Sequence, residues 1–379
     1  MRSRTLLSLA ITFFALSLPA RIHASAPQYR VLDLGSFGPF ANDVFGINAS
    51  GQVVGNALVP RNGMPPNPLQ TSVQHAIRWT GTVAEELGPL DTASGWGYSI
   101  NDFGQIAGAS GPTLAQGQAV RWTGTTAEFL PSLGGPSVGV GINNSGQIAG
   151  YFGTLGPLVA SPASYAVRWT GAVAEALETP DGLHSAAFAI NEVGQVAGSL
   201  FDRRISGQTS SQAVRWTGTT LETLGTLGGT RSGASGINAA GQVTGGAYLP
   251  GDSVMHAVRW TGTTPVDLGT LGGTFSVGYA INGSGDVTGI SLDAGGFNFV
   301  PFLYTDGVMY DLKSLLLPDS GVTDLTLGNP CNNLNDLGQI AAYGTIGGQR
   351  HVLLLTPTPE PATTVLMLGG GLLLGLRRR

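Results

Sequence analysis

The chain is poor in cysteine, in lysine and in charge. Cys331 is its only cysteine, which excludes an intramolecular disulfide and any site built from several thiolates. Lys313 is the only lysine beside 17 arginines, and charged residues make up 11% of the 379 residues. The segment 27–358 has 22 acidic residues against 12 basic ones, a net charge of −10, so we expect it to bind no nucleic acid and to repel anionic lipid.

Motifs that would indicate catalysis or a cofactor are also missing. There is no Gly-x-Ser-x-Gly nucleophile elbow, no His-Glu-x-x-His zinc motif, no phosphate-binding loop and no Ser-His-Asp order. Paired carboxylates such as Glu85 and Glu86 follow an internal repeat and give no specific glycosidase signal. The sequence therefore predicts no enzyme, no cofactor and no metal site.

Long apolar runs are confined to the two ends. The first residues, Met1-Arg2-Ser3-Arg4, precede an apolar run over 6–18 and small residues at Ala20, Ala24 and Ala26. This order predicts a secretory signal peptide over residues 1–26, cut after one of these three alanines. The alternative, a transmembrane anchor, is disfavoured because about 20 apolar residues are needed to span a bilayer.

The last segment, residues 357–379, has three parts. Pro359, Glu360 and Pro361 precede an apolar stretch over 362–376, and Arg377, Arg378 and Arg379 end the chain. Fifteen helical residues extend roughly 22 Å, which suffices to enter a bilayer but is short for a settled span. The arginines would hold this end on the cytoplasmic side, with the body of the chain outside.

This tail resembles the PEP-CTERM sorting signal of Gram-negative bacteria, in which the motif, the apolar stretch and the basic end occur in the same order. The resemblance implies recognition by a membrane exosortase, transient insertion of the tail in the membrane, and association of the protein with exopolysaccharide. A plain C-terminal membrane anchor is the alternative. In both cases we expect an exported protein, tethered to the membrane before processing and then located at the cell surface or outside the cell.

Glycine and internal repetition are abundant between the two ends. The chain has 59 glycines, and the segment Ile-Asn-x-x-Gly-Gln recurs with variations seven times. A second signature, Ala-Val-Arg-Trp-Thr-Gly, follows in most units, and a third, Leu-Gly-Thr-Leu-Gly-Gly, is complete in two of them, at 224–229 and 268–273. The repeated asparagines are Asn48, Asn101, Asn143, Asn191, Asn238, Asn282 and Asn335; the repeated tryptophans are Trp79, Trp122, Trp169, Trp216 and Trp260.

Each unit of about 45 residues contains four short strand patterns separated by turn signals. Seven such units predict an all-β fold, a seven-bladed β-propeller over residues 27–356, flanked by an N-terminal signal helix and a C-terminal hydrophobic helix. We expect the strand patterns at 29–34 and 350–355 to pair and close the ring, which would remove its free edges. An open β-solenoid is the alternative, although its coils are usually shorter.

The same motifs resemble the HAF-type repeats of bacterial extracellular proteins, as in His256-Ala257-Val258-Arg259-Trp260, from residue 29 to about 356. The resemblance implies an extracellular repeat protein and no particular chemistry. The third residue of the family's motif is usually Phe, whereas Ile or Val stands there in this chain.

Three sets of repeated side chains are structural candidates. His75, His256 and His351 share a repeat position with Gln118, Tyr165 and Gln212, which indicates a packing or hydrogen-bonding position. We expect the tryptophans to pack between blades, with partial exposure to a ligand as the alternative. The repeated arginines Arg78, Arg121, Arg168, Arg215 and Arg259 need acceptors, either backbone carbonyls or Glu86, Glu128, Glu175, Glu222 and Asp267.

Sequence variation is concentrated in two sets of connections. One set follows the strand that comes after each Ile-Asn-x-x-Gly-Gln segment, and the other precedes each repeated Asn. In an up-and-down sheet these connections lie on one face of the ring, and loops on a rigid scaffold are where recognition usually occurs. We therefore predict a ligand face around Trp96, Phe201, Phe297 and the loop Pro60–Pro68, with unselected drift as the alternative. The expected function is a non-catalytic, exopolysaccharide- or biofilm-associated surface protein; the alternatives are a secreted propeller enzyme acting on polysaccharide and a protein-binding adhesin.

Overall fold

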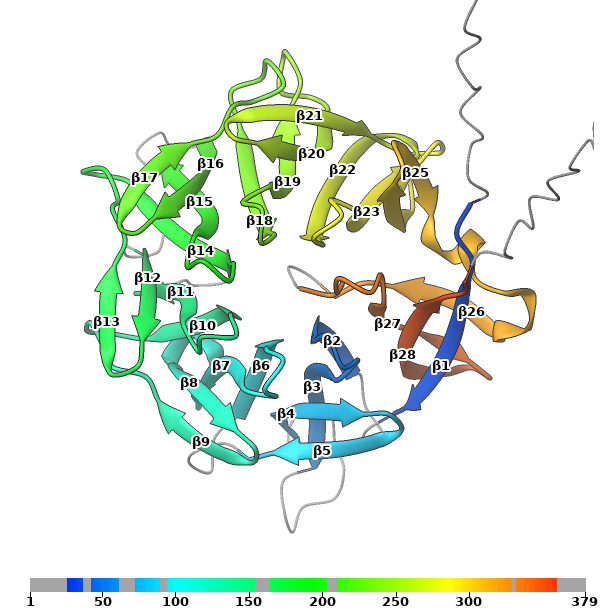
Figure 1. Ribbon diagram of the computed structural model, residues 1–379, viewed down its shortest axis with the longest axis horizontal. Helices are drawn as coiled ribbons and strands as arrows, with labels where there is room; N and C mark the ends of the chain where they lie inside the picture. Colours follow the sequence, from blue (N-terminus) through cyan, green and yellow to red (C-terminus); the bar gives the residue numbers. More distant parts are fainter. Residues whose placement is uncertain are drawn as a thin grey trace, which may run out of the picture.

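The computed structural model describes residues 26–36, 42–60, 72–88, 94–153, 164–202, 210–328 and 332–359. These residues form 28 strands in seven four-stranded antiparallel blades around a central axis. The colours of Figure 1 run once around the ring, from blue to red. The predicted all-β, seven-bladed propeller is confirmed. The two expected terminal helices lie outside the described residues.

The blades follow one another in sequence order. Blades one to four contain β2 (Asn42–Ile47), β3 (Val53–Pro60), β4 (Ser72–Thr80) and β5 (Val83–Leu87); β6 (Ser94–Ile100), β7 (Ile106–Gly111), β8 (Gln118–Thr123) and β9 (Thr126–Phe129); β10 (Ser137–Ile142), β11 (Ile148–Phe152), β12 (Tyr165–Thr170) and β13 (Val173–Ala176); β14 (His184–Ile190), β15 (Val196–Asp202), β16 (Ser210–Thr217) and β17 (Thr220–Thr223). Blades five and six contain β18 (Ser232–Ile237), β19 (Val243–Tyr248), β20 (Met255–Thr261) and β21 (Thr264–Gly269); β22 (Gly272–Ile281), β23 (Val287–Asp293), β24 (Phe299–Thr305) and β25 (Val308–Asp311).

Blade seven combines the two ends of the described chain. Its strands are β26 (Val322–Thr326), β27 (Ile340–Ile346), β28 (Gln349–Pro357) and β1 (Tyr29–Gly35). The described residues also form three short 3-10 helices: η1 (Leu114–Gln116) lies between β7 and β8, and η2 (Leu312–Leu315) and η3 (Pro318–Ser320) lie between β25 and β26. The N-terminal strand β1 pairs antiparallel with β28, from Tyr29 opposite Pro357 to Asp33 opposite Leu353. The predicted closure by residues 29–34 and 350–355 is therefore confirmed, and blade seven has its full complement of strands.

The Asn-x-x-Gly segments form the turn between the first two strands of each blade, as their sequence predicts. In blade three, Gly146 has a φ of +74°, and its N–H donates to the carbonyl oxygen of Asn143 at 3.0 Å. A second glycine is needed for a different reason. At Gly108 in β7, an added Cβ would lie 1.8 Å from the carbonyl oxygen of Trp96 in β6, so no larger residue fits this close strand contact.

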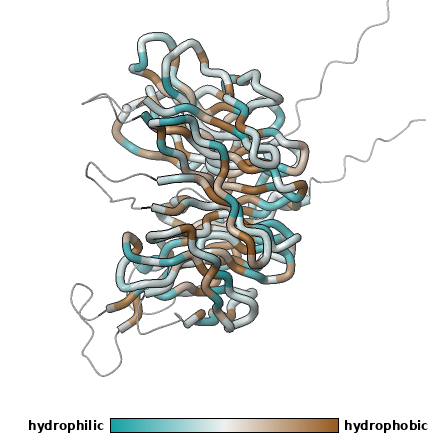
Figure 2. The backbone as a smooth tube through the Cα atoms, turned by 90° about the vertical axis from the view of Figure 1, so that its left-hand side faces the viewer, coloured by the Kyte–Doolittle hydropathy of each residue, from teal (hydrophilic) through white to brown (hydrophobic). Residues whose placement is uncertain are grey.

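The tryptophans form much of the packing between blades. All five repeated tryptophans are at most 2% exposed, which confirms the predicted core role and leaves no indole face for a ligand. Four indole nitrogens also donate to a carbonyl on the segment that leaves the preceding blade, for example from Trp216 to Glu178 at 2.8 Å. Figure 2 shows hydrophobic and hydrophilic segments alternating throughout the ring, which fits a core divided among the blade interfaces.

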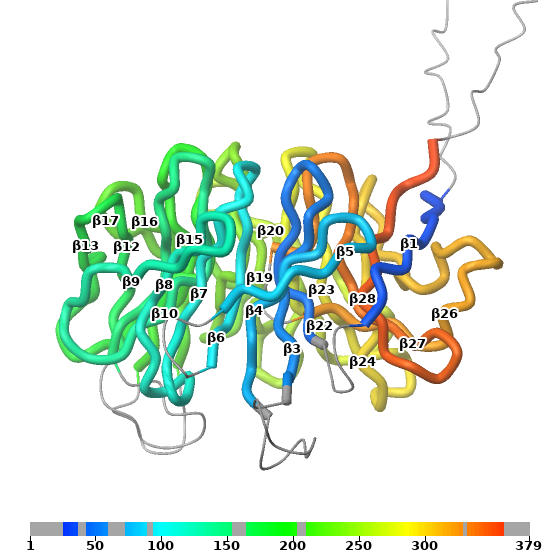
Figure 3. Tube along the Cα trace, turned by 90° about the horizontal axis from the view of Figure 1, so that it is seen from below, coloured from blue at the N-terminus to red at the C-terminus, as the bar shows by residue number. Residues whose placement is uncertain are grey.

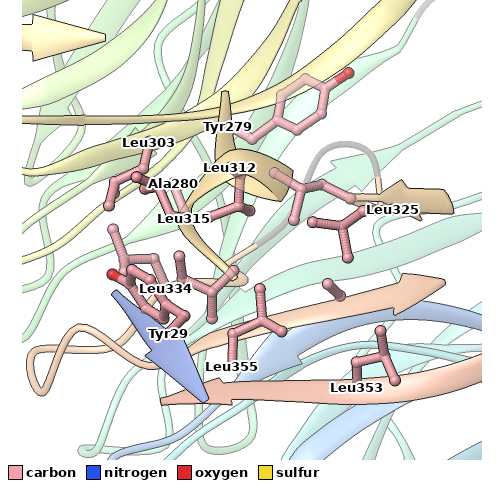
Figure 4. Packing of buried hydrophobic residues seen from close by; sticks show 13 residues of the cluster. Tyr29, Tyr279, Ala280, Leu303, Leu312, Leu315, Leu325, Leu334, Leu353 and Leu355 are labelled. Carbon is pink, nitrogen blue, oxygen red and sulfur yellow. The ribbon is translucent and has the colours of Figure 1, made fainter. Parts of the chain in front are cut away.

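The largest apolar cluster lies where the ring closes. Figure 4 shows Tyr29 of β1 beside Leu355 of β28, with Leu312 and Leu315 of η2 and Leu303 of β24 around them. Each of these side chains is at most 5% exposed. The closure of the ring is thus a hydrophobic contact as well as a strand pairing.

Candidate functional site

The antiparallel order of each blade gives the ring two different faces (Figure 3). The Asn-x-x-Gly and Trp-Thr-Gly turns lie on one side, which we call the uniform face. The loops after the second and fourth strands lie on the other side, which we call the variable face. Both described chain ends leave from the uniform face, where Thr358 N–H donates to the carbonyl oxygen of Gln28 at 2.8 Å.

The repeated asparagines link the blades into a ring on the uniform face. Asn143 donates through Nδ2 to the carbonyl oxygen of Asn191 in the next blade at 3.0 Å and to Gln147 Oε1 at 2.9 Å. Its Oδ1 accepts the N–H of Gln147 at 2.9 Å. Six such links between neighbouring blades, at 2.9–3.1 Å, start from Asn48, Asn101, Asn143, Asn191, Asn238 and Asn335. The Ile-Asn-x-x-Gly-Gln motif therefore encodes a contact between blades as well as a turn.

The repeated arginines make a second set of links. Arg168 donates through Nη1 to the carbonyl oxygen of Gly194 in the next blade at 3.0 Å and through Nη2 to Glu175 at 2.6 Å. The other four arginines also donate to a glycine carbonyl of the following blade, at 2.6–3.5 Å. Both predicted acceptor types are therefore used.

Two of the five predicted carboxylate partners are wrong. Arg78 pairs with Glu85 and not with Glu86, since Glu85 is directly opposite it in the β4–β5 register. Arg259 faces Val266 in the corresponding place, so it has no carboxylate opposite it. The pairs with Glu128, Glu175 and Glu222 are as predicted.

Glu86 and Asp267 instead pair with the repeated histidines. His75 contacts Glu86, and His256 Nδ1 lies 2.9 Å from Asp267. His351 Nδ1 lies 2.8 Å from Asp33, which links β28 to β1. The histidine position is a hydrogen-bonding position, as predicted. In the part of the chain that the structure describes, no group of three or more His, Cys, Asp and Glu is arranged to hold a metal ion.

Three carboxylates lie at the mouth of the central channel on the uniform face. Asp102, Glu192 and Asp336 line a cavity of about 140 Å³ there. Burial, opposed by a hydrogen bond from Asn144 N–H and assisted by the charges of Asp102 and Asp336, raises the pKa of Glu192. Asp102 and Asp336 also accept N–H groups of neighbouring turns, from Ala49 at 2.8 Å and Gly283 at 2.7 Å. These carboxylates thus extend the network between blades.

The channel narrows behind this mouth. A smaller cavity of about 30 Å³ lies deeper, lined by Ser99, Gly141 and Ser235 from the innermost strands. Asn332 lines both cavities, and its carbonyl oxygen accepts the N–H of Ile47 at 2.9 Å. The segment that contains Asn332 therefore narrows the channel from the side of blade seven.

A larger groove opens on the variable face between blades four and five. Its volume is about 530 Å³, and it reaches the edge of blade six at Val277. Its apolar walls are formed by Phe188, Phe201, Tyr248, Met255 and Val277, and its polar lining by Ser199, Ser211, Arg231, Ser232 and Ser235. Aromatic and apolar walls with a few polar groups are typical of small-molecule and saccharide sites.

The charge of Arg231 in this groove is balanced locally. The guanidinium carbon lies 4.0 Å from the centre of the Tyr248 ring, and Nη2 donates to the carbonyl oxygen of Asp252 at 3.0 Å. Hydrogen bonds from Thr230, assisted by the charge of Arg231, lower the pKa of the Asp252 carboxyl. Asp252 therefore stays ionised beside Arg231, and these two opposite charges offset each other.

The structure places the three predicted ligand-face residues in three different blades. Phe201, in β15, lines the groove. Phe297 lies at the tip of the β23–β24 hairpin and is 89% exposed. Trp96 is partly buried in β6 of blade two, away from blades four and five that form the groove. The loop Pro60–Pro68 lies outside the described residues except for Pro60.

Arg231, Tyr248 and Phe188 were not predicted from the sequence. One feature of the sequence could have indicated Arg231 as a site residue. It is an arginine outside the repeated arginine position, in a variable segment of a chain with few cations. Phe188 and Tyr248 lie in strands whose patterns are those of every blade. Their groove depends on how two blades meet, which no single repeat reveals.

Comparisons with known proteins support the fold alone. No family model matches the chain, and no curated protein matches it. Among solved structures, the β-propeller domain of the trilobed protease from Pyrococcus furiosus is similar, with a TM-score of 0.54 and 8% identity over 83% of this chain and 95% of that one. The acylaminoacyl peptidase of Pyrococcus horikoshii has a TM-score of 0.50 and 9% identity over 87% of this chain and 54% of that one. The first has an open velcro topology, whereas β1 closes the ring here.

These likenesses define the chain as a β-propeller. No helix among the residues that the structure describes is long and apolar enough to cross a membrane. The segment 362–376, where the sequence predicts insertion, is outside those residues, as are Glu360, Pro361 and the three terminal arginines. Pro359 is described and exposed.

Proposed function

We propose that this chain is an exported, non-catalytic β-propeller of the cell surface or extracellular matrix, and that it binds polysaccharide on its variable face. The observation that carries the proposal is the groove of about 530 Å³ between blades four and five, with its aromatic walls and serine hydroxyls. Sugar rings stack on aromatic side chains through their apolar faces, while their hydroxyls need donors and acceptors at the edge of the site.

The position of the chain ends supports the same function. Gln28 and Thr358 are hydrogen-bonded to each other at 2.8 Å, and both described chain ends leave the ring on the side opposite the variable face (Figure 3). A tail tethered in the membrane would therefore direct the variable face away from it. The groove would then be open to extracellular polymer.

Binding is tested with the full chain, purified in detergent, on an array of neutral and acidic oligosaccharides. We expect binding to at least one neutral glycan. Phe201→Ala, which removes a groove wall, should weaken it at least about fivefold. The matched control is Phe103→Ala on the uniform face, because Phe103 is 76% exposed and far from the groove. Equal loss in both variants, or no binding to any glycan, would contradict the proposal.

Export is tested separately, by the mass of the mature protein. In a Gram-negative host with an exosortase, we expect the surface form to begin after Ala20, Ala24 or Ala26 and to end near Pro359–Pro361. Replacing Glu360 with Ala should leave the protein in the membrane fraction at its longer mass. A surface form that retains Arg377, Arg378 and Arg379 would exclude processing at this motif.

The carboxylates at the channel mouth favour a second candidate, an enzyme acting on polysaccharide. Asp102, Glu192 and Asp336 converge there, and the pKa of Glu192 is raised, as a general acid requires. A screen of reducing-end release on neutral and acidic polysaccharides distinguishes the two functions. Activity that is lost in Glu192→Gln and retained in Phe201→Ala would support the enzyme and contradict the binding protein.

A further inference from the structure

We infer that the groove is one end of a longer binding surface, which holds several consecutive units of an uncharged polysaccharide. This inference rests on the proposed function. The other part of the binding surface is the phenylalanine patch, which we define as Phe275, Phe297 and Phe299 of blade six.

The patch is continuous with the groove. Val277 of β22 lines the groove, and Phe275 lies two residues before it on the same strand, at a distance of about 6.6 Å along the strand axis. Residues at this spacing project from the same side of a strand, and the buried Ser276 between them fits that alternation. Met255, another groove residue, is the register partner of Phe275 in the parallel bridge between β20 and β22. The groove wall thus leads directly to the patch.

The patch presents apolar rings to solvent in a fixed arrangement. The rings of Phe275 and Phe299 lie 5.6 Å apart at 84°, in an edge-to-face contact. Phe299 is 60% exposed and Phe297 is 89% exposed. The hairpin that carries Phe297 is held by Asp293, whose carboxylate accepts Phe297 N–H at 3.2 Å and Asn298 Nδ2 at 2.7 Å. A preorganised loop loses little entropy when a ligand binds.

The shape of the surface indicates an internal stretch of a polymer. Phe188 and Ser235 line both the groove and the narrow part of the channel, so the inner end of the groove is at the channel axis. From there the surface leads outward past Met255 to the hairpin tip at Phe297. A surface that is aromatic along its length suits successive sugar rings, whereas one sugar unit would contact only part of it.

Charge indicates that the polymer is neutral. Among the residues that the structure describes, Arg231 is the only cation that lines the groove, and Asp252 offsets its charge as described above. The segment 27–358 has a net charge of −10, which disfavours the approach of a polyanion. A protein partner is the other occupant that exposed phenylalanines suit, and the experiment separates it from a glycan.

The experiment measures binding of the full chain in detergent to neutral gluco-, galacto- and manno-oligosaccharides of two to ten units, and to uronate-containing oligomers of the same lengths. We expect affinity for the recognised neutral series to rise at least about tenfold with length before it levels off. The variant F297A/F299A should lower the affinity for the longest oligomers at least about fivefold and leave the shortest unchanged. F201A should weaken both. F103A, on the opposite face, should weaken neither.

The outcomes separate the two proposals. Binding that does not depend on length, that is unaffected in F297A/F299A, or that prefers uronates would overturn this inference and leave the glycan-binding function standing. An absence of binding to every oligosaccharide would overturn both. Pull-down of a protein that is lost in F297A/F299A, without any glycan binding, would identify the patch as a protein-docking surface and overturn the inference as well. Unchanged melting curves of the variants would show that they remain folded.

Discussion

The uniform face and the variable face are built from the same 28 strands, but they differ in how much the repeat controls them. On the uniform face, Asn143 and its six equivalents are buried, and six of the seven donate a hydrogen bond to the next blade. On the variable face, the repeat position shared by the groove residues Phe201 and Tyr248 holds a different type of residue in the other blades: Leu58, Gly111, Gly153, Leu292 and Thr345. Repetition in this sequence therefore maintains the ring, while departures from repetition shape the surface on which a ligand can bind.

Opening the ring should have the largest effect on the protein. Deletion of Tyr29–Gly35 removes β1, leaves β28 with an unpaired edge, and takes Tyr29 and Leu34 out of two apolar clusters. We expect loss of a cooperative thermal transition by circular dichroism, and association of the chains in size-exclusion chromatography. The control replaces residues 294–297 of a variable loop with Gly and Ser at the same length. A β1-less chain that melts within a few degrees of the full chain would show that closure is dispensable.

Replacement of a single repeated asparagine should have the next largest effect on stability. Asn143→Ala removes two donated hydrogen bonds and one accepted one at a buried turn, so we expect a loss of about 3 kcal/mol in the free energy of unfolding. Urea denaturation measures it, and Ser145→Ala in the same turn, at an exposed position, is the control. A cost below about 1 kcal/mol would mean that the asparagine ring contributes little to stability.

The arginine links should have a smaller effect. Arg168→Met breaks the contacts with Glu175 and with the Gly194 carbonyl and should cost about 1–2 kcal/mol, because Glu175 is 41% exposed and its contribution is screened. Arg259→Met should cost less, since Val266 and not a carboxylate lies opposite Arg259. Equal costs in the two variants would assign the whole effect to the carbonyl contacts. An unchanged melting curve for Arg168→Met would show that these arginine contacts contribute no measurable stability.

Glu192 gives the uniform face a weak dependence on pH. Its pKa is raised in the folded state, so the folded protein favours the protonated form. The stability associated with this group is present below the unfolded-state pKa and is lost as the pH rises through the higher folded-state pKa. Glu192→Gln should therefore raise stability at pH 7, by less than about 1 kcal/mol because the group is partly exposed. Melting curves from pH 3 to 7 measure the difference, and a difference that shrinks as the pH rises would contradict the sign.

The smallest effect is expected on the variable face. Phe297→Ala should change the free energy of unfolding by no more than about 0.5 kcal/mol, since Phe297 is 89% exposed. Phe302→Ala in the neighbouring strand is the matched control, because Phe302 is fully buried and should cost about 3–5 kcal/mol. If Phe297→Ala destabilised the protein as much as Phe302→Ala, the variable face would be part of the scaffold.

Most of the fold could be predicted because its information is local and repeated. The Asn-x-x-Gly turn, the alternating strand at His75–Thr80 and the seven-fold recurrence determine blade size and number, and the strand patterns at the two ends predicted the closure. Side-chain pairs that depend on strand register were harder to predict from the sequence. Glu85 and Glu86 are adjacent in sequence, and only the strand register decides that Arg78 pairs with the first and His75 with the second.

The candidate site could be predicted only in part. Phe201 belongs to a variable segment, and variability alone predicted its face. Arg231 and Phe188 reach the same groove from two different blades, so their proximity depends on the angle between blades. The carboxylates at the channel mouth, Asp102, Glu192 and Asp336, directly follow three of the seven repeated asparagines. Only the closed ring brings them together around the axis.

The position of β28 has a mechanical consequence. It is flanked by β27 and β1, and its last residue, Pro357, is next to the point where the described chain ends. A pull on the protein through Pro357 along the strand would load the hydrogen bonds on both sides of β28 in shear, so many bonds would resist together instead of opening one after another. Such a strand would let the ring withstand tension from flowing liquid or moving polymer while the blades keep their shape.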